Sequence, residues 1–247
     1  MEEIIRPTKN YADVLDELSG DVVFDMDEVL VDIFPTVFMH LQRNIERYEP
    51  YLTKDNVFDV ETINRRKDHD LRVHLMKGEY HGLPHDQRSE IVDAIRAKKV
   101  DRDYWKSDMY ANLSPTGLGR GVMERRFIGR EDVRSVTILT FTSSEKLNEH
   151  KTKFVEKYFN HPKIRLVPVM FSTRSKRSTK SGRMKKLKLN WDCFVDDMEY
   201  NIRDFAESFP DLNGKRLYSP DMGYNQPSEE LIKLIESKGG KYERYVP

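Results

Sequence analysis

Apolar positions along the chain fall into short runs typical of buried strands and longer stretches with helical spacing. The strand-like runs cover residues 22–25, 133–141, 164–170, 193–195 and 215–218. Apolar side chains at helical spacing predict helices over residues 144–159, 201–208 and 229–238. Because strands alternate with helices, the pattern predicts a parallel, Rossmann-like α/β sheet.

A long, mostly helical stretch separates the first two predicted strands. It begins with apolar residues at helical spacing, namely Phe34, Val37, Phe38, Leu41 and Ile45. Roughly 100 residues are too many for an ordinary crossover between neighbouring strands. We therefore expect a core built from residues 1–32 and 131–247, with residues 33–130 inserted as a helical cap domain.

Several classes of protein are excluded by composition. No run of about 18 apolar residues is present, which argues against a membrane-spanning helix. The N-terminus lacks the cationic and apolar regions of a secretory signal. Cys193 is the single cysteine of the 247 residues, so an internal disulfide framework and a multi-cysteine zinc site are both excluded. These features predict a soluble protein of the reducing cytoplasm.

Charge is balanced overall but unevenly distributed. The chain has 42 basic and 42 acidic residues, and residues 172–188 hold eight of the basic ones and no acidic one. The rest of the chain therefore carries a net charge of −8. Such a segment is either a solvated loop or a contact surface for an anionic partner.

Polar side chains of catalytic type follow the predicted strands. These are Asp25 and Asp27, then Thr142 and Ser143, and finally Asp196 and Asp197. The carboxyl ends of parallel strands converge on one crevice, where four carboxylates would repel each other without a cation. Oxygen ligands favour a hard cation, most simply Mg²⁺. Hydroxyls and a lysine beside such an ion suit a phosphoryl group, so the pattern predicts phosphoryl transfer.

Four sequence motifs together resemble the haloacid dehalogenase-like superfamily. They are FDMDEVLVD at 24–32, VTILTFTSS at 136–144, a lysine near Lys186, and FVDD at 194–197. The closest resemblance is to the 5′(3′)-deoxyribonucleotidases. DMDEV, with Glu28 where many superfamily members have glycine, looks like their bacterial and phage members, as do FVEKYF at 154–159 and NLSP at 112–115. The resemblance covers residues 20–205.

The resemblance implies a role for each motif residue. Asp25 would be the nucleophile that forms an aspartyl-phosphate, and Asp27 the general acid and base. The Asp25 carboxylate and the Asp27 carbonyl, with Asp196 and Asp197, would bind Mg²⁺. Thr142, helped by Ser143, would hold the phosphate.

The resemblance also calls for a lysine that neutralises the phosphoryl group. Lys186 precedes Asp196 by ten residues, the spacing that the nucleotidase pattern suggests. Lys180 and Lys185 are its rivals, because the segment is rich in lysine. Arg183 is a further candidate for contact with the substrate.

The family implies hydrolysis of a nucleoside or deoxynucleoside monophosphate, with cap aromatics stacking on the base. Phe34, Trp105 and Tyr110 are candidates for this contact, although each could equally belong to the core of the cap. The family's aromatic after the first motif falls one position earlier, at Ile33 in this chain, which weakens a transfer of pyrimidine preference.

Two alternatives remain open. The basic segment could guide a phosphatase to the 3′-phosphate ends of nucleic acids, since eight cations could follow a polynucleotide backbone. Alternatively, the protein could bind nucleic acid or a partner with only vestigial catalysis, although the intact Asp25 and Asp27 argue against this. A phage member would act in the host cytoplasm. The sequence leaves the oligomeric state open.

Overall fold

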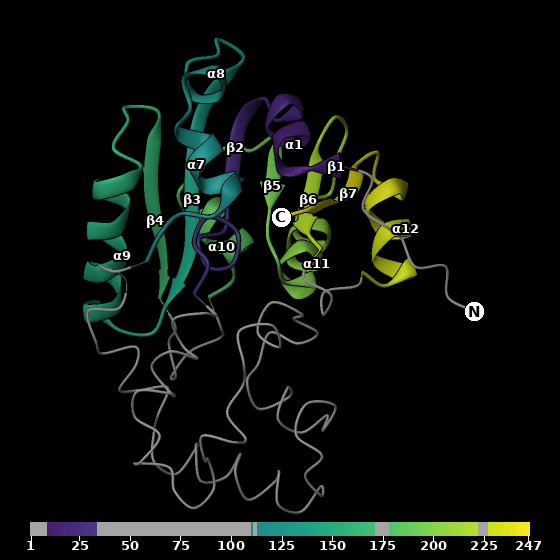
Figure 1. Cartoon of the computed structure of the whole chain (residues 1–247). Coiled ribbons are helices and arrows are strands. Elements are labelled where there is room, and N and C mark those ends of the chain that lie inside the picture. Colours follow the sequence, from purple (N-terminus) through teal and green to yellow (C-terminus); the bar gives the residue numbers. More distant parts are fainter. Residues whose placement is uncertain (1–8, 34–109, 111–112, 171–177, 222–226) are drawn as a thin grey trace, which may run out of the picture. The chain divides into compact units, whose positions relative to one another are not determined.

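The computed structural model describes residues 9–33, 110, 113–170, 178–221 and 227–247. These residues form a seven-stranded sheet in which every paired strand is parallel, in the order β1-β7-β6-β5-β2-β3-β4 (Figure 1). The predicted Rossmann-like α/β class is confirmed. The chain divides into two compact units, residues 1–32, 114–221 and 225–247, and residues 33–113 with 222–224.

The longest strand, β3, lies next to the edge strand β4. The strand bounds are β1 Lys9–Asn10, β2 Gly20–Phe24, β3 Val133–Thr142, β4 Ile164–Met170, β5 Cys193–Val195, β6 Arg216–Pro220 and β7 Lys241–Val246.

The described helices connect these strands. They are α1 Tyr11–Glu17, α7 Gly117–Met123, α8 Arg125–Ile128, α9 Glu145–Tyr158, α10 Lys180–Lys186, α11 Glu199–Ser208 and α12 Glu229–Ser237. None of the helices in this part of the chain has both the length and the apolar character needed to cross a bilayer.

Strand order reverses at β2. The chain runs outward from β2 through β3 to the edge strand β4, and then returns through α10 to β5 on the other side of β2. In open parallel sheets, the crevice outside the carboxyl ends of the strands at such a reversal is where ligands bind. The ends of β2 and β5 are therefore the expected location of a site.

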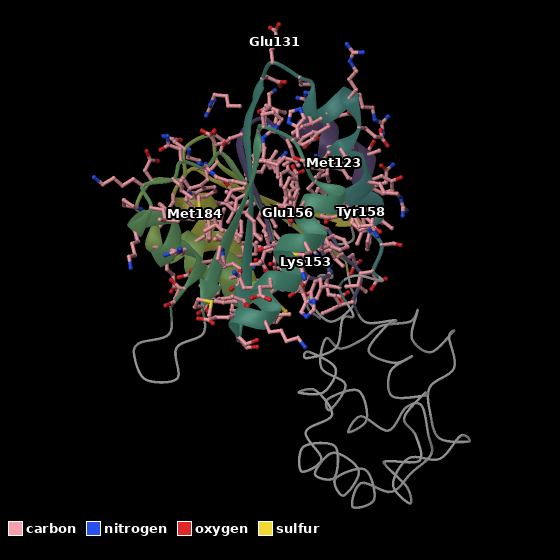
Figure 2. All side chains as sticks on the ribbon, turned by 90° about the vertical axis from the view of Figure 1, so that its left-hand side faces the viewer. Met123, Glu131, Lys153, Glu156, Tyr158 and Met184 are labelled. Atoms are coloured by element: carbon pink, nitrogen blue, oxygen red, sulfur yellow. The ribbon has the colours of Figure 1, made fainter. Side chains whose placement is uncertain are left out.

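Both faces of the sheet are covered. On one face, Met184 of α10 packs in a buried cluster with Val23, Val169, Phe205 of α11 and Ile235 of α12. Helix α9 covers the other face, so Lys153 on α9 and Met184 on α10 lie on opposite sides of the sheet (Figure 2). Burial on both faces explains why the central strands read as nearly continuous apolar runs.

The α/β core includes more of the chain than the sequence pattern predicts. Helices α7 and α8 were assigned to the cap, but the ring of Phe127 lies 6.5 Å from that of Phe24, and Gly121 packs against Leu15 of α1. Helix α1 and strands β1 and β7 were not predicted. Of residues 33–112, only Ile33 and Tyr110 belong to the described residues.

Candidate active site

A tight turn directly follows β2 and carries both motif aspartates. The Asp25 N–H donates to the Val195 carbonyl at 2.8 Å, which fixes the start of the turn against β5. Glu28 adopts a φ of 61° and is buried. A left-handed conformation costs a side chain about 1–2 kcal/mol but costs glycine little.

Three buried carboxylates meet at the ends of β2 and β5. Asp25, Asp196 and Asp197 each offer an oxygen, and these oxygens lie within 4.8 Å of one another. The three residues are at most 6% exposed. Two strands that are far apart in sequence but paired in the sheet therefore bring together the acids of the first and last motifs.

Lys180 is the lysine that lies among these acids. Its ammonium is 2.8 Å from Asp25 Oδ1 and 2.6 Å from Asp196 Oδ2, and the residue is completely buried. Lys180 is the first residue of α10, whose N-cap is Thr179. Burial alone would lower the pKa of Lys180, but the Asp196 and Asp25 carboxylates outweigh it and raise the pKa above its usual range.

The cluster has more negative than positive charge. Three carboxylates surround one ammonium, which leaves a formal charge of about −2 in a region shielded from water. Burial, opposed by Lys180 and reinforced by Asp196 and Asp27, raises the pKa of Asp25 to about 7. A divalent cation with oxygen ligands would relieve this repulsion, so the donor set fits Mg²⁺ held by Asp25, Asp196 and Asp197.

Helix α11 fixes the orientation of Asp196. Its Oδ1 accepts hydrogen bonds from the Met198 N–H and from the Asn201 side chain, both at 2.9 Å. Asn201 lies on the buried side of α11, where a polar residue usually has a hydrogen-bond partner. The sequence motifs do not predict its role. With Oδ2 held by Lys180, this carboxylate has little freedom to rotate.

The two predicted hydroxyl residues differ in exposure. Thr142 is the last residue of β3 and is buried, and its hydroxyl donates to the Ser144 carbonyl at 2.9 Å. Ser143 is exposed. Ser144 caps α9 by accepting from the Leu147 N–H. Contact of Thr142 and Ser143 with phosphate therefore stays a prediction.

Asp27 has an unforeseen partner in Lys151 of α9. The Lys151 ammonium donates to Asp27 Oδ2 at 2.6 Å, to Thr140 Oγ1 at 2.7 Å and to the Phe141 carbonyl at 2.9 Å. Three acceptors saturate the three N–H groups of an ammonium. The sequence feature that could have indicated a buried role for Lys151 is its position on the apolar side of α9, between Leu147 and Phe154.

The motif resemblance implies that Asp27 is the general acid and base; on that hypothesis Lys151→Met should lower kcat ten- to hundredfold with a much smaller change in KM, because Asp27 would lose the group that fixes its carboxylate. Removing the buried ammonium also leaves two β3 acceptors without this donor, which should cost about 2–4 kcal/mol of stability. Steady-state kinetics and thermal unfolding test both effects. Lys153→Met, an exposed change on the same helix, is the control. Equal kcat values for the two variants would contradict the assignment.

Lys185 and Lys186 of the basic segment, both among the described residues, form no ion pair with the three buried acids. Lys186 is exposed at the end of α10, and the Lys185 ammonium donates to the Ser208 carbonyl above the ring of Phe209. The helical phase explains the difference, since Lys180 and Met184 share the buried side of α10 and Lys186 does not. The structure thus places Lys180, the rival, where Lys186 was expected.

The predicted substrate-binding aromatics gain no structural support. Tyr110 is fully buried. Phe34 and Trp105 lie outside the described residues. Tyr200, which was not predicted, is 55% exposed in the first turn of α11, three residues after Asp197. Partial shielding of its ring, followed by the Asp196 carboxylate, raises the pKa of Tyr200 to about 12, and Asp25, Asp197 and Lys180 also act on it. An exposed ring therefore lies near the acidic cluster.

Comparisons with known proteins agree on the fold. No protein-family model matches the chain, and no curated protein matches it. A candidate phosphatase from Clostridium difficile superposes with a TM-score of 0.50 at 14% identity, over 91% of this chain and 94% of its own. At these identities the similarity establishes the fold alone.

Two further solved structures have haloacid dehalogenase names. A candidate haloacid dehalogenase-like hydrolase from Bacteroides fragilis has a TM-score of 0.47 at 12% identity, covering 93% of this chain and 97% of its own. A HAD-superfamily hydrolase of subfamily IA from Geobacter sulfurreducens has a TM-score of 0.45 at 17% identity, covering 90% and 97%.

Proposed function

We propose that the protein is a Mg²⁺-dependent phosphomonoester hydrolase that acts through an aspartyl-phosphate on nucleoside or deoxynucleoside monophosphates. The observation that carries the proposal is the buried set of Asp25, Asp196, Asp197 and Lys180 at the reversal of strand order. Such a set combines a nucleophilic carboxylate, ligands for a hard cation and a fixed positive charge. The fold shared with a candidate phosphatase agrees with this chemistry.

The chain's own residues would divide the reaction into two displacements. Asp25 attacks phosphorus, the bond to the leaving oxygen breaks, and Asp27 gives that oxygen a proton. Water then attacks phosphorus, its proton passes to Asp27, and the bond to Asp25 breaks, which releases phosphate. Lys180 stabilises the negative charge on the phosphoryl oxygens. Bound Mg²⁺ would supply further charge neutralisation.

The hydrogen bonds at Asp25 and Asp27 suit these roles. Asp25 Oδ1 accepts a hydrogen bond from the backbone N–H of Met26 at 2.7 Å and forms an ion pair with Lys180. The Asp25 carboxylate is therefore held in one orientation. Lys151 holds Asp27 from the opposite face of the sheet. Preorganised groups of this kind lower the barrier because little rearrangement accompanies the reaction.

Tyr200 supports a nucleotide as the substrate. An exposed aromatic ring beside a charged site is suited to stack on a base, an interaction worth about 1–3 kcal/mol. Tyr200→Ala should raise KM for a nucleoside monophosphate about fivefold to a hundredfold, while Tyr200→Phe should retain binding. Ribose 5-phosphate, which lacks a base, is the matched control substrate. A similar KM change for both substrates would argue against base stacking.

Phosphate release across a substrate panel tests the assignment. The panel holds 5′- and 3′-nucleotides of both sugars, a DNA oligomer with a 3′-phosphate, 2-phosphoglycolate and a hexose phosphate, each with Mg²⁺. Preference for mononucleotides is expected. Preference for the sugar or glycolate phosphates would overturn the nucleotide assignment. Binding of the oligomer without any phosphate release would favour vestigial catalysis.

A further inference from the structure

A cationic pocket lies along α10, the helix that begins at Lys180. It has a volume of about 430 Å³ and is lined by residues 168–170 at the end of β4, by Ser178 and Thr179, and by Gly182, Arg183 and Lys186 of α10. The described lining contains two cations and no carboxylate. Its β4 wall is apolar, so the pocket combines positive charge with a surface suited to a sugar or base.

The two cations of this pocket lack partners within the described part of the chain. Arg183 Nε is buried and makes no hydrogen bond. Neither Arg183 nor Lys186 takes part in an ion pair there, whereas the arginines Arg130, Arg134 and Arg244 pair with aspartates. A buried guanidinium nitrogen without an acceptor is costly, and an anionic ligand would supply one.

Helical geometry connects the pocket to the phosphoryl site. Lys180, Arg183 and Lys186 recur every three residues, so each lies about 60° further around α10 and about 4.5 Å further along it. The three cations therefore form a stripe that leads from the buried acids toward the edge strand. A nucleic-acid strand advances about 3.4 Å per nucleotide, so the stripe spans about two to three nucleotides.

We propose that this pocket binds a backbone phosphate of a nucleic-acid strand whose terminal phosphate occupies the Lys180 site. The inference rests on the proposed function and extends its substrate range: besides a mononucleotide, the same site would accept the terminal phosphate of a strand. The single phosphate of a nucleoside monophosphate would lie at Lys180 and the metal-binding acids, so an anion at Arg183 and Lys186 would be a second phosphate. Arginine suits this role because its guanidinium fork matches phosphate geometry.

Fluorescence anisotropy with a 3′-phosphorylated, single-stranded DNA oligomer tests the proposal. Full-length protein with Asp25→Asn serves as the background so that the probe stays intact. Adding Arg183→Gln and Lys186→Gln is expected to weaken binding at least tenfold at about 0.1 M salt. The slope of log K against log salt should fall by about 0.7, since the pocket binds one phosphate and each lost phosphate contact contributes about 0.7 for single strands.

The matched control removes two exposed lysines elsewhere, Lys153→Gln with Lys233→Gln. It should change the affinity less than twofold and leave the slope unchanged. Equal losses in the two double variants would overturn the proposal. Should the pocket variant fail to fold, the exposed single change Lys186→Gln should still weaken binding and lower the slope, by less than about 0.7.

Competition identifies the source of the second phosphate. Unlabelled oligomer is expected to displace the probe far better than a nucleoside 3′,5′-bisphosphate or inorganic phosphate. Equal displacement by the bisphosphate would overturn the strand assignment. Because these measurements need no turnover, they remain interpretable even if the substrate panel refutes hydrolysis.

Discussion

Asp25→Asn is expected to abolish phosphate release and, at the same time, to stabilise the metal-free protein. The lost nucleophile should reduce kcat by at least a thousandfold. Asparagine keeps the shape of aspartate and can still accept from Lys180, but it removes one of three crowded, buried carboxylates. Active sites often retain such destabilising groups because function requires them.

The stability difference between Asp25→Asn and the wild type should depend on pH in a definite direction. Burial, reinforced by neighbouring carboxylates, raises the pKa of Asp25 to about 7, above its value in an unfolded chain. The folded state therefore holds the proton more tightly, and its stability falls as the pH rises from about 4 to about 7. Asp25→Asn does not lose stability in this way. Its free energy of unfolding should therefore exceed that of the wild type by a margin that grows over this pH range and reaches on the order of 1–3 kcal/mol at pH 8.

Urea unfolding of both proteins in EDTA at pH 5 and pH 8 measures the effect. Mg²⁺ should then stabilise the wild type more than the variant, since it binds the folded wild-type site more tightly. A variant that is less stable than the wild type at pH 8 without metal would contradict this account of the charge.

Lys180→Met is expected to have the largest combined effect on activity and stability. It removes the ammonium that contacts both Asp25 and Asp196. Breaking a buried ion pair from one side typically costs 3–5 kcal/mol, because the remaining charges lose their compensation. Turnover should fall at least a thousandfold, since the phosphoryl group loses a fixed positive charge.

Lys186→Met provides the comparison that separates the two lysines. Lys186 is exposed, so its substitution should change stability by less than about 0.5 kcal/mol and lower turnover of a mononucleotide less than about tenfold. Added Mg²⁺ should restore part of the stability of Lys180→Met but not its turnover. A larger loss of activity for Lys186→Met than for Lys180→Met would restore the assignment made from sequence spacing.

Sequence patterns located the central strands because these are buried on both faces. The predicted run at 22–25 overlaps β2, and the one at 193–195 coincides with β5; the run at 164–170 coincides with the edge strand β4. Strand β7 was missed because its sequence, KYERYV, has neither a continuous apolar run nor regular alternation, and it pairs with a short edge strand. Helix α1 was missed although Asn10 and Asp13 form a capping box at its start.

The site was predictable in its acids but not in its lysines. Aspartates directly after strands are fixed by the sheet, so Asp25, Asp196 and Asp197 were found from local sequence and are now seen to meet. Which lysine points inward depends instead on the phase of α10, where one residue shifts the direction by about 100°. Lys151 comes from a helix on the other face, a contact that no local pattern near Asp27 indicates.

The most direct test of the central claim is to look for a phosphoryl group on Asp25. Wild-type protein would be mixed with Mg²⁺ and the best substrate of the panel, quenched in acid during turnover, digested and analysed by mass spectrometry. The account predicts a phosphorylated peptide that contains Asp25, and predicts its absence in EDTA and in Asp25→Asn. Turnover without any phosphorylated Asp25 peptide, or with undiminished activity in Asp25→Asn, would contradict the proposed mechanism.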